Sequence, residues 1–146
     1  MSKRTTVYIS DKIQKIIGSY GEENSLSGVI STLVDRYNQL TQEAIPIFSE
    51  AEWSLICEDA LKGCSVAQVS GDSDPAAMVW ANIYDCKPEI GEKWGVNCKE
   101  LADKIHSLPL SGRMAVWDLA ARFWASPQRN KIETRKLLVG VGAKLK

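Results

Sequence analysis

The sequence has little of what metal sites and most hydrolytic active sites are built from. It contains a single histidine, His106, and four cysteines whose spacing fits no CxxC or zinc-binding pattern: Cys57, Cys64, Cys86 and Cys98. We therefore expect no metal and no other cofactor, and we interpret the cysteines as reduced thiols packed like small hydrophobic side chains. Asp103 and Ser107 stand near His106, but neighbours in sequence do not form a catalytic triad. We predict that the protein is not an enzyme.

The sequence also lacks long hydrophobic runs. None approaches the roughly 20 apolar residues that a membrane-spanning helix requires. The start, MSKRTTVYIS, has no apolar segment of the kind found in signal peptides. We therefore expect a cytoplasmic protein with no membrane partner. Apolar residues still make up 45% of the 146 positions, which is enough to form a hydrophobic core.

The chain has no net charge, with 18 basic and 18 acidic residues, but these charges are unevenly distributed. Residues 1–46 are neutral. Residues 47–126 carry seven basic and twelve acidic residues, a net charge of −5, and residues 127–146 carry six basic residues and one acidic residue, a net charge of +5. Two interpretations stay open. The basic tail pairs with the acidic middle, within one chain or across a dimer, or it forms a mobile arm that binds a polyanion.

The beginning of the chain alternates as a β-strand does. Residues 4–9 have two faces, the first made of Arg4, Thr6 and Tyr8 and the second of Thr5, Val7 and Ile9. A single strand cannot satisfy its own backbone donors and acceptors. Because the chain beyond it is predicted to be helical, the most direct partner is the same strand of a second copy, so we expect a homodimer.

Helix signals cover most of the remaining chain. Apolar side chains recur at helical spacing after residues that favour helix N-caps, and helices are expected to start at Ser10, at Ser25 or Ser27, and at Ser49, Asp74–Pro75, Asn97 and Ser111. A last helix is expected over about residues 130–139. Residues 86–96 contain two glycines and a proline, which predict a loop.

The segment Arg4–Leu40 resembles the ribbon-helix-helix superfamily, the Arc and MetJ class of repressors. The resemblance covers about a quarter of the chain and rests on the alternating strand, the strand-to-helix junction Ser10–Asp11, the helix-ending Gly21 and the start of the second helix at Ser25–Leu26–Ser27. It implies that two chains interlock. It also implies that their N-terminal strands pair antiparallel and form a ribbon that enters the DNA major groove.

The resemblance also assigns residues to DNA. The outward strand side chains, Arg4, Thr6 and Tyr8, are expected to contact base edges. Lys3 and Arg4, with Lys12 and Lys15, supply a local positive face. The simpler alternative is that the outward strand residues form a solvated strand face.

A phosphate is expected at the start of the second helix. There the backbone N–H groups of Ser25, Leu26 and Ser27 meet the positive end of the helix dipole. The alternative is that Ser25 and Ser27 merely cap the helix, and the two roles are compatible.

Residues 46–146 are too many for a simple tail. They hold all five tryptophans: Trp53, Trp80, Trp94, Trp117 and Trp124. We interpret them mainly as core residues of a helical domain of unrecognised family. Trp117 and Trp124 lie seven positions apart on one expected helix, so an exposed shared face there would be an interface for a partner.

The predicted fold class is mainly α. An N-terminal ribbon-helix-helix domain spans residues 1–45, with one strand and two helices in an intertwined dimer. An all-helical domain spans residues 46–146 and ends in the basic tail 127–146. The predicted function is a dimeric regulator, a transcriptional repressor or autoregulator, that binds double-stranded DNA. Dimers are expected to pair into tetramers on tandem sites. Alternatively, the C-terminal domain is expected to bind a protein partner.

The alternative is a protein-interaction module of the antitoxin or inhibitor type, in which the N-terminal domain serves mainly to dimerise. Two features favour it. The N-terminal segment is electrically neutral, whereas DNA-binding domains tend to be basic. The linker between its helices is longer than the family's usual one and carries Glu22 and Glu23 near the expected phosphate.

Overall fold

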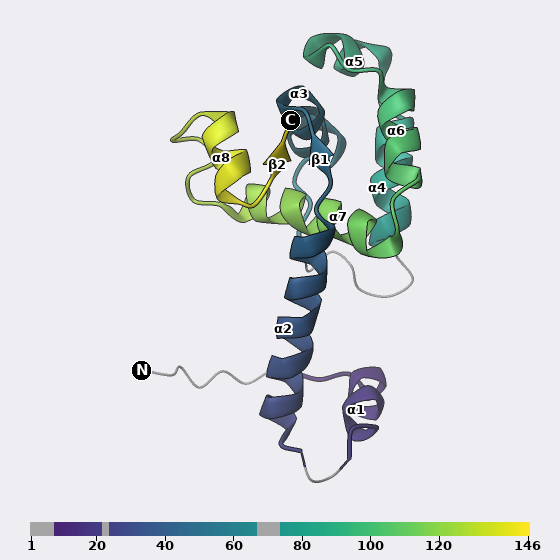
Figure 1. Ribbon diagram of the computed structural model, residues 1–146, viewed down its shortest axis with the longest axis vertical. Coiled ribbons are helices and arrows are strands. Elements are labelled where there is room, and N and C mark those ends of the chain that lie inside the picture. Colours follow the sequence, from purple (N-terminus) through teal and green to yellow (C-terminus); the bar gives the residue numbers. More distant parts are fainter. Residues whose placement is uncertain (1–7, 22–23, 67–73) are drawn as a thin grey trace. The chain divides into compact units, whose positions relative to one another are not determined.

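The computed structural model describes residues 8–21, 24–66 and 74–146 (Figure 1). Over these ranges the protein is mainly helical, with eight α-helices, one π-helical segment and one two-stranded sheet. This confirms the mainly α class expected from the sequence. The chain forms two compact units, Met1–Gln39 and Leu40–Lys146, and their boundary falls inside helix α2 (Leu26–Ala44).

The smaller unit contains α1 (Asp11–Gly18) and the first part of α2. Ser10 caps α1 as expected, because its hydroxyl oxygen accepts a hydrogen bond from the amide of Ile13 at 3.4 Å. Ser25, rather than Ser27, caps α2, and its hydroxyl accepts from the amide of Gly28 at 3.1 Å. Of the strand expected over residues 4–9, residues 4–7 lie outside the described ranges, and Tyr8 and Ile9 have no regular secondary structure.

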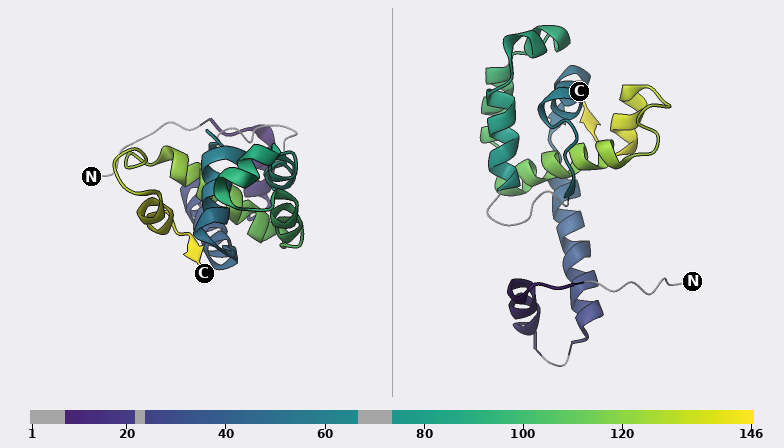
Figure 2. Two further views of the ribbon diagram at one scale, coloured as in Figure 1. Left: turned by 90° about the horizontal axis from the view of Figure 1, so that it is seen from above. Right: turned by 180° about the vertical axis from the view of Figure 1, so that it is seen from behind.

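The larger unit begins with the end of α2, which is followed by β1 (Ile47–Phe48), α3 (Glu50–Ser54) and the π-helical segment η1 (Leu55–Ala60). Ser49 and Glu52 form the expected capping box: the Ser49 hydroxyl accepts from the Glu52 amide, and the Glu52 carboxylate accepts from the Ser49 amide. The chain then continues through α4 (Pro75–Tyr84), α5 (Pro88–Trp94), α6 (Cys98–His106), α7 (Leu110–Ala125), α8 (Thr134–Gly140) and β2 (Lys144–Leu145). In Figures 1 and 2, α4 and α6 run side by side, and α7 crosses near their ends.

The loop predicted for residues 86–96 is wrong, because most of this segment is helix α5. Pro88 occupies the first turn, where its missing N–H costs nothing, and Gly95 ends the helix with a left-handed φ of 64°. The residues that suggested a loop therefore mark the two ends of a short helix. Gly91 is also required for packing, since a Cβ there would lie 2.6 Å from the carbonyl oxygen of Val96.

The larger unit is also not all-helical, because β1 and β2 pair in parallel, with Ile47 opposite Lys144 and Phe48 opposite Leu145. The amide of Lys146 donates to the carbonyl of Phe48 at 3.0 Å, and the indole of Trp53 donates to the carbonyl of Lys144 at 3.1 Å. Strands of two residues have no periodicity to detect. Their pairing joins segments almost a hundred residues apart.

The tryptophans belong to the core of the larger unit, as the sequence analysis predicted. Trp53 and Trp117 are buried, and Trp80, Trp94 and Trp124 are partly buried against the same cluster. Trp117 is only 3% exposed, so it does not form an exposed partner surface with Trp124. Of the cysteines, Cys57 and Cys64 are buried, and Cys86 and Cys98 are partly exposed; all four are free thiols.

Within the described ranges, none of the helices combines the length and the apolar composition needed to cross a membrane.

We expect Glu52 to make the stability of the larger unit depend on pH. Burial raises the pKa of Glu52, but hydrogen bonds from Lys104 and Ser49 outweigh burial and hold the pKa below its ordinary value of 4.5. Because its pKa is lowered in the folded protein, ionised Glu52 stabilises the fold at pH values above 4.5. This stability is lost as the pH falls through the lowered pKa. The Glu52→Gln variant should therefore be less stable at pH 7 by about 1 kcal/mol and lose less stability on acidification.

Urea unfolding at several pH values between about pH 7 and pH 3 measures this difference. The matched control is Glu50→Gln on the same helix, whose ion pair with Arg135 joins side chains that are 44% and 59% exposed. It should change stability by less than about 0.5 kcal/mol. Parallel pH profiles for the wild type and Glu52→Gln would contradict the role assigned to Glu52.

Candidate nucleic-acid interface

The residues predicted to contact DNA fall partly within the described structure. Lys3, Arg4 and Thr6 lie outside the described ranges. Tyr8 is 93% exposed, so its ring and hydroxyl are accessible to a partner. Ser25, Leu26 and Ser27 are exposed at the beginning of α2. The expected phosphate position is therefore accessible. Of the three strand residues expected to contact bases, only Tyr8 lies within the described ranges.

The start of α2 is a helix end capped by Ser25. Ser25 uses its hydroxyl to cap Gly28, and its carbonyl accepts from Val29 at 3.0 Å, which begins the helical ladder. The first N–H groups of any α-helix point away from the intrahelical acceptors and carry the positive end of the dipole. The first turn of α2 contains no acidic side chain. Capping by Ser25 and phosphate binding by the neighbouring amides are thus geometrically compatible.

The positive face expected around the strand is described in part. Lys12 and Lys15 are exposed on α1. Glu22 and Glu23, which stand near the expected phosphate in sequence, lie outside the described ranges. The described charges of the smaller unit are the basic residues Lys12, Lys15 and Arg36 and the acidic residues Asp11 and Asp35, and the first turn of α2 carries no acid.

A groove of about 490 Å³ lies within the smaller unit, between the end of α1 and the first turns of α2. Its walls mix apolar and polar side chains: Tyr20, Asn24, Ser25, Gly28, Val29, Thr32, Leu33 and Arg36. The sequence analysis did not single out Arg36 or Thr32. Gly28, Thr32 and Arg36 follow one another at intervals of four residues, which places them on one face of a helix, and this pattern was the available signal.

The basic tail is folded and in contact with the acidic middle of the same chain. Arg135 forms an ion pair with Glu50 at 2.7 Å, and the hydroxyl of Thr134 donates to Glu58 at 3.4 Å. The guanidinium of Arg129 lies 4.1 Å from the ring centre of Trp124, a cation–π contact. Of the two interpretations of the tail, the structure supports pairing within one chain.

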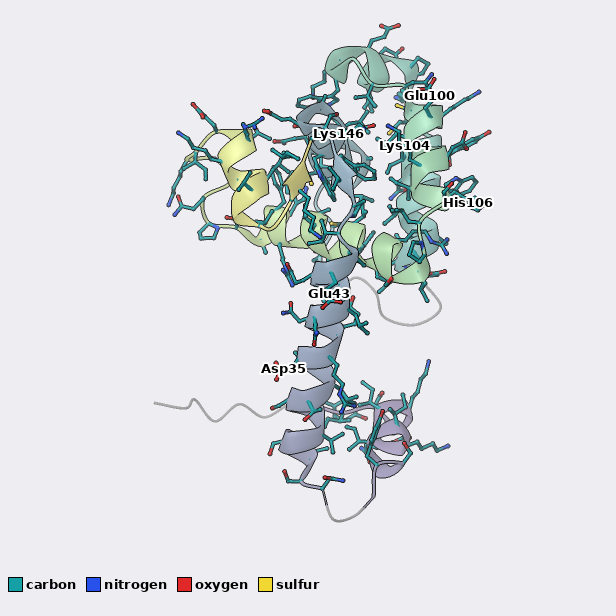
Figure 3. All side chains as sticks on the ribbon, in the orientation of Figure 1. Asp35, Glu43, Glu100, Lys104, His106 and Lys146 are labelled. Carbon is teal, nitrogen blue, oxygen red and sulfur yellow. The ribbon has the colours of Figure 1, made fainter. Side chains whose placement is uncertain are left out.

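The surroundings of His106 are those of a surface residue. The imidazole is exposed on α6 and packs against Trp80, with ring centres 5.8 Å apart. In Figure 3, His106 points outward from α6, whereas Lys104 projects inward, where it pairs with Glu52. The Ser107 hydroxyl donates to the backbone carbonyl of Asp103 at 2.9 Å, so these residues end a helix. Among the residues that the structure covers, no group of three or more metal-binding side chains comes together.

Comparison of the chain with protein-family models, with curated proteins and with solved structures found no match.

We expect Ser25 to define the start of α2. The Ser25→Ala variant loses the hydroxyl that accepts from Gly28, which should weaken the helix start by about 1 kcal/mol. Hydrogen exchange at the Gly28 amide should accelerate as a result. The matched control, Ser27→Ala, removes a hydroxyl from the same turn and should stay within about 0.5 kcal/mol of the wild type. Equal exchange rates at Gly28 in both variants would show that Ser25 is not the cap.

Proposed function

We propose that the chain is a dimeric DNA-binding regulator of the ribbon-helix-helix type, a transcriptional repressor or autoregulator. In this proposal two copies interlock through α1 and the first part of α2. Each contributes one N-terminal strand to an antiparallel ribbon in the major groove. The larger unit then serves a second contact, either with another dimer on a tandem site or with a protein partner.

The observation that carries the proposal is the exposed apolar surface of the smaller unit. Five of its large apolar side chains are between 47% and 59% exposed: Ile13, Ile16, Tyr20, Leu26 and Val34. Val29 is the large apolar residue of this unit that is buried in the described structure. A unit of about 40 residues rarely folds without oligomerisation, metals or disulfides. A second copy supplies the missing core, because the same surface on each chain covers the other.

The groove of the smaller unit also fits a second copy of the chain. Tyr20, just after α1, and Val29 and Leu33 of α2 line it, beside the two helices that interlock in this fold. Side chains of a second copy can fill this groove and remove its apolar walls from water. A symmetric pair also places two N-terminal segments together, which is what an antiparallel ribbon requires.

Strand geometry supports the reading of DNA by Arg4, Thr6 and Tyr8. Alternate side chains of a strand lie roughly 6.6 Å apart, close to two base-pair steps of about 3.4 Å each. Arg4 can bind a guanine with two hydrogen bonds, and Thr6 can bond to a base edge or contact a thymine methyl group. The accessible amides of Leu26 and Ser27 can hold a backbone phosphate and so fix the register of the ribbon.

We expect a buried charge on the apolar surface to prevent dimerisation. Val34 is 59% exposed in the single chain, so Val34→Glu should leave the protomer folded. In a dimer the new carboxylate would be buried, which should weaken association at least 100-fold, or about 3 kcal/mol. The control is Ser31→Glu, which adds the same charge at an exposed position of the same helix.

Analytical ultracentrifugation over a range of concentrations measures the association. The wild type and Ser31→Glu should sediment as dimers, and Val34→Glu as a monomer with unchanged helical circular dichroism. A wild-type chain that stays monomeric at every concentration would refute the shared core.

We expect Arg4 to contribute to sequence recognition. Selection from random duplex DNA should first yield a preferred, palindromic site. Arg4→Ala should then weaken binding to that site by about 1–3 kcal/mol while the dimer persists. Arg135→Ala removes the same charge from α8, where it pairs with Glu50, and should leave the affinity near that of the wild type.

Fluorescence anisotropy at several salt concentrations measures both affinity and the number of phosphate contacts. Affinity should fall steeply as salt rises. Dimers that bind no duplex at low salt would instead favour the alternative function, a protein-interaction module in which the smaller unit only dimerises.

A further inference from the structure

Two of the four thiols line one groove on the surface of the larger unit. Cys86 lies between α4 and α5, and Cys98 is the first residue of α6. Cys98 is near enough to be among the groups that raise the pKa of Cys86. Both line one groove of about 520 Å³, which Tyr84, Pro88 and Lys99 also line. The pair is thus both close together and open to small reagents.

The other two thiols differ in access. Cys57 is fully buried inside η1, and Cys64 is 6% exposed. Oxidants reach thiols according to exposure and thiolate character. Oxidation of the folded protein should therefore begin at Cys86 and Cys98 rather than at Cys57 and Cys64.

We propose that Cys86 and Cys98 form a reversible disulfide when the protein meets a two-electron oxidant of the peroxide class. In the first step hydrogen peroxide oxidises the Cys98 thiol to a sulfenic acid and one water is released. In the second step the Cys86 sulfur attacks that sulfenic acid, the S–S bond forms and the hydroxyl leaves as a second water. The pair loses two protons and two electrons, and peroxide takes up both and is reduced to two waters.

The position of Cys86 beside Cys98 fits the second step, and its raised pKa argues against the first. Burial, and next to it the neighbouring Cys98, raise the pKa of Cys86 to about 11. Its thiol also donates to the carbonyl of Asn82 at 3.2 Å. Cys86 is therefore held as a protonated thiol at neutral pH, which makes it a poor first target for peroxide. The Cys86 sulfur can attack a sulfenic acid on Cys98 because both residues belong to the same groove.

The bond would act on α5. Closing Cys86 to Cys98 encloses that helix in a covalent loop between the end of α4 and the start of α6. The backbone of α5 already packs closely on this sulfur, since a Cβ on Gly91 would lie 3.2 Å from Cys98 Sγ. The redox state of the pair thus sets how firmly α5 is held, independently of the proposed DNA-binding function.

The test treats the full-length reduced protein with hydrogen peroxide and counts thiols under native and denaturing conditions. The wild type should lose two of its four thiols. Mass spectrometry of a non-reduced digest should show one peptide that joins Cys86 to Cys98 within a single chain, and dithiothreitol should restore both thiols. Cys86→Ser and Cys98→Ser should form no such internal link, whereas Cys64→Ser, a control outside the pair, should form it as the wild type does.

Several results would overturn the proposal. They are retention of all four thiols, sulfinic or sulfonic acid without a linked peptide, and a disulfide that joins two chains or involves Cys57 or Cys64. If a serine variant does not fold, the peptide map of the oxidised wild type decides between these outcomes by itself.

Discussion

Burial of the segment that follows Pro46 holds the larger unit together. Trp53, Leu55, Ile56 and Cys57 are completely buried in consecutive turns of α3 and η1. Helices α4, α5, α7 and α8 all pack on this segment, which therefore contacts elements from the whole length of the unit. Fully burying side chains of this kind contributes roughly 1.5–3 kcal/mol each.

Polar groups around this segment are satisfied by distant side chains. The indole N–H of Trp124 donates to the carbonyl of Cys57 at 2.6 Å, and the carboxylate of Asp59 accepts from Trp94 and from Lys93. Burial raises the pKa of Asp59, but the bonds from Trp94 and Lys93 outweigh it and hold the pKa below its ordinary value. Trp94 and Trp124 thus contribute both apolar area and hydrogen bonds, whereas the buried indole nitrogen of Trp117 has no hydrogen-bond partner among the residues that the structure describes.

The two units differ in how far they bury their apolar side chains. The larger unit buries its apolar side chains within one chain. The smaller unit leaves side chains such as Ile13, Ile16 and Val34 half exposed, so a single chain gains little from folding them. This contrast makes dimerisation a property of the smaller unit in the proposed function. It leaves the larger unit free to carry a second role, including the thiol chemistry of Cys86 and Cys98.

The local sequence determined the helix boundaries where a side chain acts on its own backbone. Ser10, Ser49 and Asn97 each start a helix by accepting from amides two or three residues ahead, and such contacts depend on nothing distant. The tertiary structure decided the features that join remote segments: the β1–β2 pair, the placement of Arg135 on Glu50, and the position of Cys86 and Cys98 in one groove. Helix α5 lies between these cases, because its proline and glycine are local signals that fit a loop as well as a short helix. Periodicity and capping act over about four residues, whereas packing chooses among partners anywhere in the chain, and only the folded arrangement selects one of them.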